Sequence, residues 1–274
     1  MTQDPSHHDR DAVDPGPDGG GESAASAALI RALAAHPEDI ARLVDELHRR
    51  VTDEDSLLDL MHRTSREAVR MITDVHWAGV TAQFAGAPFT AANTDSRVLV
   101  VDEGQYGQGD GPCLQSMRTD QVVVMTEEQV ADRWPLLAAA TRAAGVHAFH
   151  AEPLHARGQA AGSLNLYSAT LGGLQDPDPD VLTVLTEYLD RGLTDYSAAQ
   201  PGEPDAHRLQ TSLRRRHVVN QAVGALMAAH GVSAAEGMRS LQDRAGDNSR
   251  LEQAARDVIA EYTRQPGEEK SDPV

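Results

Sequence analysis

The sequence predicts an α+β domain followed by a small all-α domain, and three observations carry this prediction. Strand-like segments alternate with helical ones between residues 76 and 167, which is typical of a mostly antiparallel sheet flanked by helices. After a Pro- and Gly-containing break at 199–206, only helical periodicity follows. A chain of 274 residues, 40% of them hydrophobic, is long enough for about two domains with real cores.

The N-terminal region divides into a tail and a helical extension. Residues 1–21 contain Asp, Pro, Gly and His without apolar periodicity, and we predict that they form a disordered tail. Residues 22–53 have a helical register of apolar side chains, interrupted near Pro37. This extension either pairs with the same segment of a second copy or packs on the domain that follows.

The α+β domain is predicted to span 54–198. Its expected helices are Glu54–Thr73, Val98–Gln105, Cys113–Met117, Pro135–Ala144 and Pro179–Ala198. Its expected strands are His76–Phe84, Pro88–Asn93, Gln121–Met125, Val146–Leu154 and Gln159–Tyr167, the last two joined by a turn at Arg157-Gly158. Residues 199–206 form the linker to the second domain, and this break interrupts any continuous helix between the two.

The all-α domain is predicted to span 207–264 as three helices, with a second disordered tail at 265–274. The first helix carries one apolar stripe, made of Leu209, Leu213, Val219, Ala222 and Leu226, and stops at Gly231. The second helix starts at the Ser233–Glu236 capping box and stops at Gly246. Asn248 or Ser249 can cap the third helix, whose stripe runs from Leu251 to Tyr262.

Charge is segregated along the chain. The formal net charge is -18, whereas residues 207–264 hold nine arginines against six acidic residues. Local positive charge on an acidic protein favours an anionic partner, and the planar guanidinium suits phosphate. The alternative is an ordinary solvated helix face in which arginine replaces lysine, because Lys270 is the only lysine.

One motif in this region is more specific than charge. It reads Arg216-x-Val-Val-x-Gln221-Ala222-x-Gly224-x-Leu226-Met227 and is followed by Gly231, Ser233, Leu241, Asn248, Leu251 and Ala255. This pattern resembles the ANTAR domain, a three-helix RNA-binding module of bacterial transcription antiterminators. The resemblance implies binding to paired RNA hairpins in nascent transcripts, which prevents a terminator from forming, and paired hairpins imply a homodimer. The candidate RNA-binding residues are Arg214, Arg215, Arg216, Asn220, Gln221, Gly224, Asn248 and Arg250.

Two positions depart from this family's pattern. Val223 stands where the family usually has lysine, and Ala245 where it usually has serine. Arg214 and Arg215 are candidates to replace a missing phosphate contact. Otherwise RNA affinity is reduced, and the protein is a signalling adaptor whose C-terminal helices dock another protein.

The α+β domain carries a second set of anchors. They are Tyr106-Gly-Gln-Gly-Asp-Gly111-Pro112-Cys113, Arg133-Trp134-Pro135, Gly145, Pro153-Leu154 and Gly162-Ser-Leu164-Asn165-Leu166-Tyr167. These anchors resemble the GAF domains of actinobacterial signalling proteins. The resemblance implies a small ligand or cofactor in a pocket between sheet and helices, or dimerisation alone, and does not name the cofactor.

Three residues are candidate sensor groups. Cys113 follows Gly-Pro at an expected helix start, where a thiol pKa can be lowered, although a buried, inert cysteine is the plainer interpretation. His147 and His150 lie near Glu152 and His155, but strand alternation places His147 and His155 on one face and the other two on the opposite face. We therefore expect no metal centre made from all four.

The sequence contains no catalytic constellation on which an enzyme mechanism could be based. The glycines at 107, 109 and 111 lack the Lys-Ser/Thr pair of a phosphate-binding loop and are interpreted as a turn with unusual backbone angles. A single cysteine excludes an intrachain disulfide and fits a reducing compartment. Without an apolar run of membrane length or a leader, we expect a cytoplasmic protein with no membrane partner.

Overall fold

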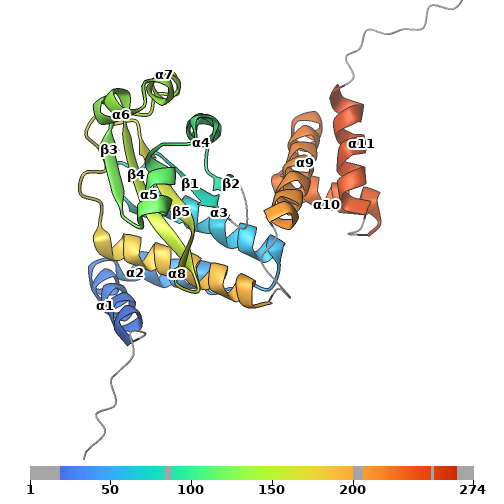
Figure 1. Cartoon of the computed structure of the whole chain (residues 1–274). Helices are drawn as coiled ribbons and strands as arrows, with labels where there is room; N and C mark the ends of the chain where they lie inside the picture. The colour runs from blue at the N-terminus through green and yellow to red at the C-terminus, as the bar shows by residue number, and fades with distance from the viewer. Residues whose placement is uncertain (1–18, 84–87, 200–205, 248–249, 264–274) are drawn as a thin grey trace, which may run out of the picture.

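The computed structural model describes residues 19–83, 88–199, 206–247 and 250–263. It confirms an α+β domain built on a five-stranded antiparallel sheet and followed by helices only (Figure 1). The strand order is β2-β1-β5-β4-β3, and every neighbouring pair is antiparallel. The strands are β1 Trp77–Ala82, β2 Phe89–Asn93, β3 Val123–Thr126, β4 Ala148–Ala156 and β5 Gln159–Ser168.

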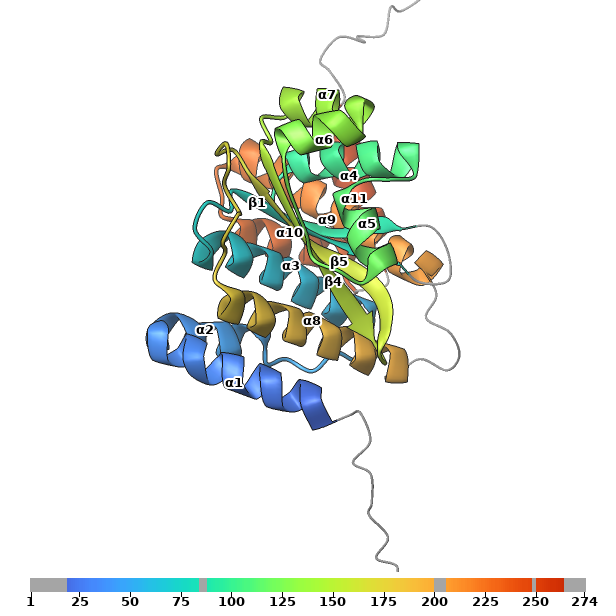
Figure 2. The ribbon, with the colours of Figure 1, turned by 60° about the vertical axis from the view of Figure 1, so that its left-hand side comes forward.

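Helices cover both faces of the sheet (Figure 2). One face packs on α3 (Glu54–Met71) and α8 (Pro179–Ala199), and this interface forms the largest apolar cluster. The other face is covered by shorter helices with their own clusters. These are α4 Ser96–Gln108, α5 Pro112–Thr119, α6 Glu127–Arg133 and α7 Pro135–Ala143.

Helix α6 was not predicted from the sequence. It follows β3 directly, because Thr126 ends the strand and caps the helix: its side chain accepts from the Gln129 backbone N–H, and the Gln129 side chain accepts from the Thr126 N–H. This arrangement is a capping box, which was a readable signal. The helix buries only Val130, so its apolar periodicity was too weak to find it.

The N-terminal extension packs on the α+β domain. It forms α1 (Gly19–Ala35) and α2 (Pro37–Leu47), which separate where Pro37 begins the second helix. Ala32 and Leu43 are buried in the cluster shared with α3 and α8. Arg31 donates to both carboxylate oxygens of Asp180 on α8, at 2.7 to 3.0 Å. The extension therefore forms a second helical layer on that face, outside α3 and α8 (Figure 2).

The C-terminal region forms three helices, α9 (Ala206–His230), α10 (Ala234–Ala245) and α11 (Leu251–Thr263). The predicted Ser233–Glu236 capping box is present, and Gly231 and Gly246 have positive φ angles after α9 and α10. The predicted caps at Asn248 and Ser249 lie outside the described residues. We call α9, α10 and α11 the three-helix module; in Figure 1 it stands beside the end of α3.

Candidate nucleic-acid interface

The apolar stripe of α9 serves two cores. Val219, Ala222 and Leu226 are buried with α10 and α11 in the module's own cluster. Leu209 is completely buried in the α3–α8 cluster of the α+β domain, and Leu213 packs against that cluster. The predicted apolar stripe is therefore present, but its two ends are buried by different parts of the chain. The stripe is continuous because α9 is one helix, but its first turns are anchored on the α+β domain.

The arginines between these two halves are held by acidic residues of α3. The Arg216 guanidinium donates to Asp59 at 2.6 Å, to Asp55 at 3.4 Å and to the Asp55 backbone carbonyl at 2.7 Å. Arg215 pairs with the same Asp55 carboxylate. Two of the predicted RNA-binding arginines are thus already engaged by carboxylates. We call this set of contacts the α3–α9 clasp.

A further contact extends the clasp toward the start of α9, where Arg208 lies 2.7 Å from Glu54. The acidic residues at the start of α3 also stabilise that helix itself. Glu54 and Asp55 occupy the first turn of α3, where negative charge stabilises the helix dipole. Asp53 caps the same helix by accepting from the Ser56 N–H, and this bond lowers the pKa of Asp53. The start of α3 therefore carries several carboxylates for reasons of its own, independently of the packing of α9.

A cleft of about 390 Å³ lies between α3 and the module. It brings together residues that are far apart in the sequence: Asp55, Asp59, Arg215, Arg216, Val219, Asn220, Met238 and Leu251. Three of the predicted RNA-binding residues, Arg215, Arg216 and Asn220, therefore share one cleft with the start of α11. Arg250 precedes Leu251, and its side chain is 77% exposed near Asp247.

The remaining described candidates lie on a second, open face. Arg214, Gln221 and Gly224 are all exposed, at helical spacings that align them on one side of α9. A Cβ at Gly224 would meet nothing within 4 Å, so this glycine is not required for packing between helices. It leaves the helix backbone open to a close approach from outside. Asn248 lies outside the described residues.

The two family departures are core positions. Val223 is 7% exposed and packs in the module cluster, where a Cβ on Gly237 of α10 would lie only 3.3 Å from Val223 Cγ1. Ala245 is also 7% exposed. A lysine at 223 would have to leave the α9–α10 contact to reach solvent.

Cys113 does not have the surroundings of a reactive thiol. It is 1% exposed, and burial raises the pKa of its thiol well above the ordinary value. The expected place at a helix start is correct, since α5 begins at Pro112, but the Cys113 N–H donates to Gln105 Oε1 at 2.8 Å. The preceding turn has the predicted unusual angles, with φ 70° at Gly109 and 156° at Gly111. Gly111 packs closely on the Gln105 side chain, whereas a Cβ at Gly109 would meet nothing within 4 Å.

The interior between the sheet and α4 holds a polar network that the sequence analysis missed. Asp102 is completely buried and accepts from Thr90 Oγ1 and Tyr167 Oη, both at 2.6 Å. Burial raises the pKa of Asp102 to about 6, against the opposing effect of these hydrogen bonds. Tyr106 joins the network through Thr90. The available signal was one carboxylate within the apolar run 98–102, on a helix already predicted.

The four candidate residues around β4 do not form one group, because each histidine has a different partner. His150 bonds Glu152 at 2.6 Å, whereas His147 lies 2.5 Å from Glu127 at the start of α6. His155 instead contacts Asp190 on α8 and Asp120. The register between β4 and β5 shifts between Leu154 and His155, where Ala161 of β5 has no partner on β4, and that His147 and His155 share a face stays a prediction. In the described parts of the chain, no group of three His, Cys, Asp or Glu is placed to hold a metal ion.

Comparison with protein families matches residues 56–190 to the GAF domain and residues 207–259 to the ANTAR domain. A search of curated proteins found no match to the chain. None of the helices within the described residues is both long enough and apolar enough to span a membrane. The GAF match falls on the α+β domain, and the ANTAR match falls on the three-helix module.

Proposed function

We propose that this chain, which contains a GAF domain followed by an ANTAR domain, is a transcription antitermination regulator whose GAF domain controls RNA access to Arg216. The ANTAR domain binds paired RNA hairpins in nascent transcripts through α9, and two chains act as a homodimer. A small ligand, a redox change or a partner at the GAF domain supplies the signal. The chain has no catalytic role in this scheme.

The α3–α9 clasp is the observation that carries the proposal. Arg216 is the residue that best matches the family's RNA-binding arginine, and carboxylates surround it where RNA phosphates would bind. A carboxylate and a phosphate oxygen are alternative acceptors for the same guanidinium. RNA binding at Arg216 and the clasp therefore compete, and the described conformation is the inhibited one.

The strength of the clasp suits a reversible switch. The side chains of Asp55 and Asp59 are 45% and 49% exposed, so each ion pair contributes about 0.2–1 kcal/mol. The pairs together would weaken RNA binding about five- to tenfold, given that about 1.4 kcal/mol corresponds to a factor of ten. A contact of this size holds the module in the absence of a signal and yields to RNA when α3 moves.

The test compares two variants of equal charge in the full chain. Asp55→Asn/Asp59→Asn removes the two carboxylate charges that hold Arg216, while Glu128→Gln/Asp132→Asn removes two exposed carboxylate charges of α6. We expect the first pair to raise affinity for a dual-hairpin RNA about five- to tenfold and the second to have little effect. Titrations at two salt concentrations measure the affinity, since phosphate contacts weaken with salt.

Arg216→Ala provides the complementary control, because it should abolish most salt-sensitive binding in both backgrounds. Equal gains from the two paired variants would mean that total charge governs affinity and the clasp does not. If neither the parent chain nor Asp55→Asn/Asp59→Asn binds RNA, the antitermination proposal fails. The adaptor interpretation would then replace it.

A further inference from the structure

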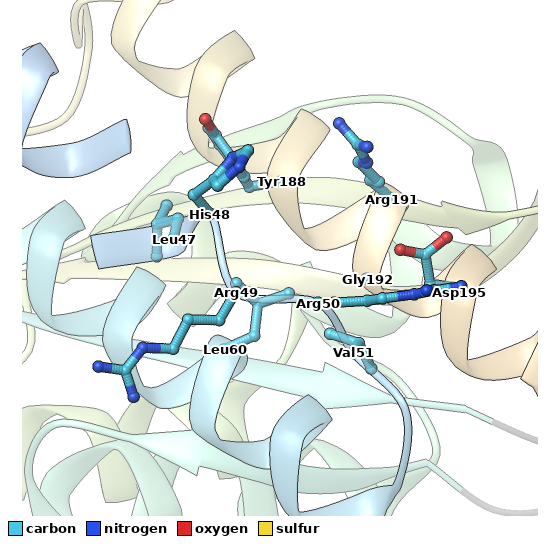
Figure 3. Close-up of a pocket in the computed structure, with 10 residues that line it drawn as sticks. All are labelled: Leu47, His48, Arg49, Arg50, Val51, Leu60, Tyr188, Arg191, Gly192 and Asp195. Atoms are coloured by element: carbon cyan, nitrogen blue, oxygen red, sulfur yellow. The ribbon is translucent and has the colours of Figure 1, made fainter. Parts of the chain in front are cut away.

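A second pocket lies on the opposite side of α3 from the sheet, outside the GAF interior. It has a volume of about 340 Å³ and is formed by the α2–α3 connection, α3 and α8 (Figure 3). Its floor is apolar, made in part by Val51 and Leu60. Gly192 of α8 permits this close packing, because a Cβ there would lie 2.2 Å from Leu60 Cδ2.

The rim of this pocket is basic. His48, Arg49 and Arg50 are consecutive, and Arg191 comes from α8. Most arginines of the GAF-domain half are neutralised by an acidic residue, for example Arg31 by Asp180, Arg97 by Asp95 and Arg142 by Glu127. In the described residues 19–83 and 88–199, the arginines with no ion pair, hydrogen bond or ring contact are Arg49, Arg50, Arg66 and Arg191.

Three of these four unpaired arginines line one pocket. The chain has 42 acidic residues against 24 basic ones, so unpaired positive charge gathered around one cavity is unusual and favours an anionic ligand. Arg50 extends along the pocket toward Gly192 and Asp195, whereas the Arg49 guanidinium points away from the others (Figure 3). Asp195 is the one carboxylate on the rim. The Asp195 carboxylate repels an anion, so the attraction of an anionic ligand must come from Arg50 and Arg191 together.

We propose that this pocket binds a small phosphorylated molecule, with Arg50 and Arg191 on the phosphate and Tyr188 beside its organic part. Guanidinium groups bind phosphate oxygens through paired, charge-assisted hydrogen bonds. The volume is at the lower end of small-molecule sites, which limits the ligand to about the size of a mononucleotide. The inference rests on the proposed function in one respect: Leu60 in the floor adjoins Asp59, so ligand binding acts on the helix that holds Arg216.

The experiment measures binding of pyrophosphate, AMP and uncharged adenosine to the full chain by titration calorimetry at constant ionic strength. We expect pyrophosphate and AMP to bind and adenosine to bind much more weakly. Arg50→Ala and Arg191→Ala should each weaken phosphate binding about tenfold, because each removes a charge-assisted contact. Asp195→Asn should strengthen binding, because it removes the opposing carboxylate.

Two control variants separate this site from other basic surfaces. Arg66→Ala removes an exposed, unpaired arginine of α3 that does not line the pocket, and Arg216→Ala alters the RNA surface. Both should bind the probes like the parent chain. The proposal is overturned if none of the probes binds, if Arg66→Ala weakens binding as much as Arg50→Ala, or if only Arg216→Ala does so. None of these results bears on the clasp, which is tested by RNA binding alone.

Discussion

The two halves of α9 are made of similar residues but are buried in the cores of different domains. Both halves place apolar side chains toward a core and arginine or polar side chains outside. The first half is anchored through Leu209 in the GAF-domain cluster, and the second through Ala222 and Leu226 in the ANTAR cluster. An apolar stripe therefore reports that a helix is buried, but it does not report which partner buries it.

The largest expected effect is on the unfolding free energy, and it distinguishes the two leucines that anchor α9. Leu226→Ala and Leu209→Ala each remove a fully buried leucine and should each cost about 2–5 kcal/mol of unfolding free energy. Leu226→Ala should increase hydrogen exchange in α10 and α11 while leaving α3 and α8 protected. Leu209→Ala should do the reverse, since its cluster contains α3 and α8. Identical exchange patterns in the two variants would show that α9 does not divide as described.

A smaller effect concerns the position where the family usually has lysine. Val223→Lys should lower the unfolding free energy by about 1–3 kcal/mol, because the ammonium group must leave the α9–α10 contact to remain hydrated. We also expect no gain in affinity for a dual-hairpin RNA. Denaturant unfolding and RNA titration check the two statements. A stable variant with strongly increased RNA affinity would show that position 223 faces the RNA after all.

The smallest effect, with the opposite sign, is expected on the open face of α9. Gly224→Ala should stabilise the helix by about 0.5–1 kcal/mol, because alanine is the better helix former and its Cβ meets nothing within 4 Å. Its effect on RNA should be a loss of affinity, if the backbone at this glycine is approached closely. Gly237→Ala is the matched control: its Cβ crowds Val223 and should not stabilise. Unchanged RNA affinity in Gly224→Ala would remove this face from the binding surface.

Much of the fold was predictable from short-range signals. The capping box at Ser233, the break at Pro37 and the glycines after α9 and α10 act on neighbouring residues, so each can be read locally. Features that depend on pairing in space have no such local signal. The register shift at His155 depends on how β4 meets β5, and it cannot be seen in the alternation of one strand.

The sequence predicted which residues form the candidate site, but it did not predict that carboxylates already engage two of its arginines. Arg215, Arg216 and Asn220 were predicted as RNA-binding residues, Arg216 from the motif itself, and the structure brings them into one cleft. Their carboxylate partners were not predicted, because Asp55 has an ordinary local explanation in the first turn of α3, and Asp59 has one as the i,i+4 partner of Arg63. Asp102 was missed for a similar reason: a single carboxylate in an apolar run has no local signature of a network.

By itself, the sequence determined the domain classes, the three C-terminal helices and the positive charge on α9, because these follow from periodicity, caps and composition along the chain. Only the tertiary structure decided what that charge meets. Arg216 and Asp59 are 157 residues apart, and no local rule relates them. Ion pairs depend on separation in space, so the same arginine is exposed or engaged according to how α9 packs on α3.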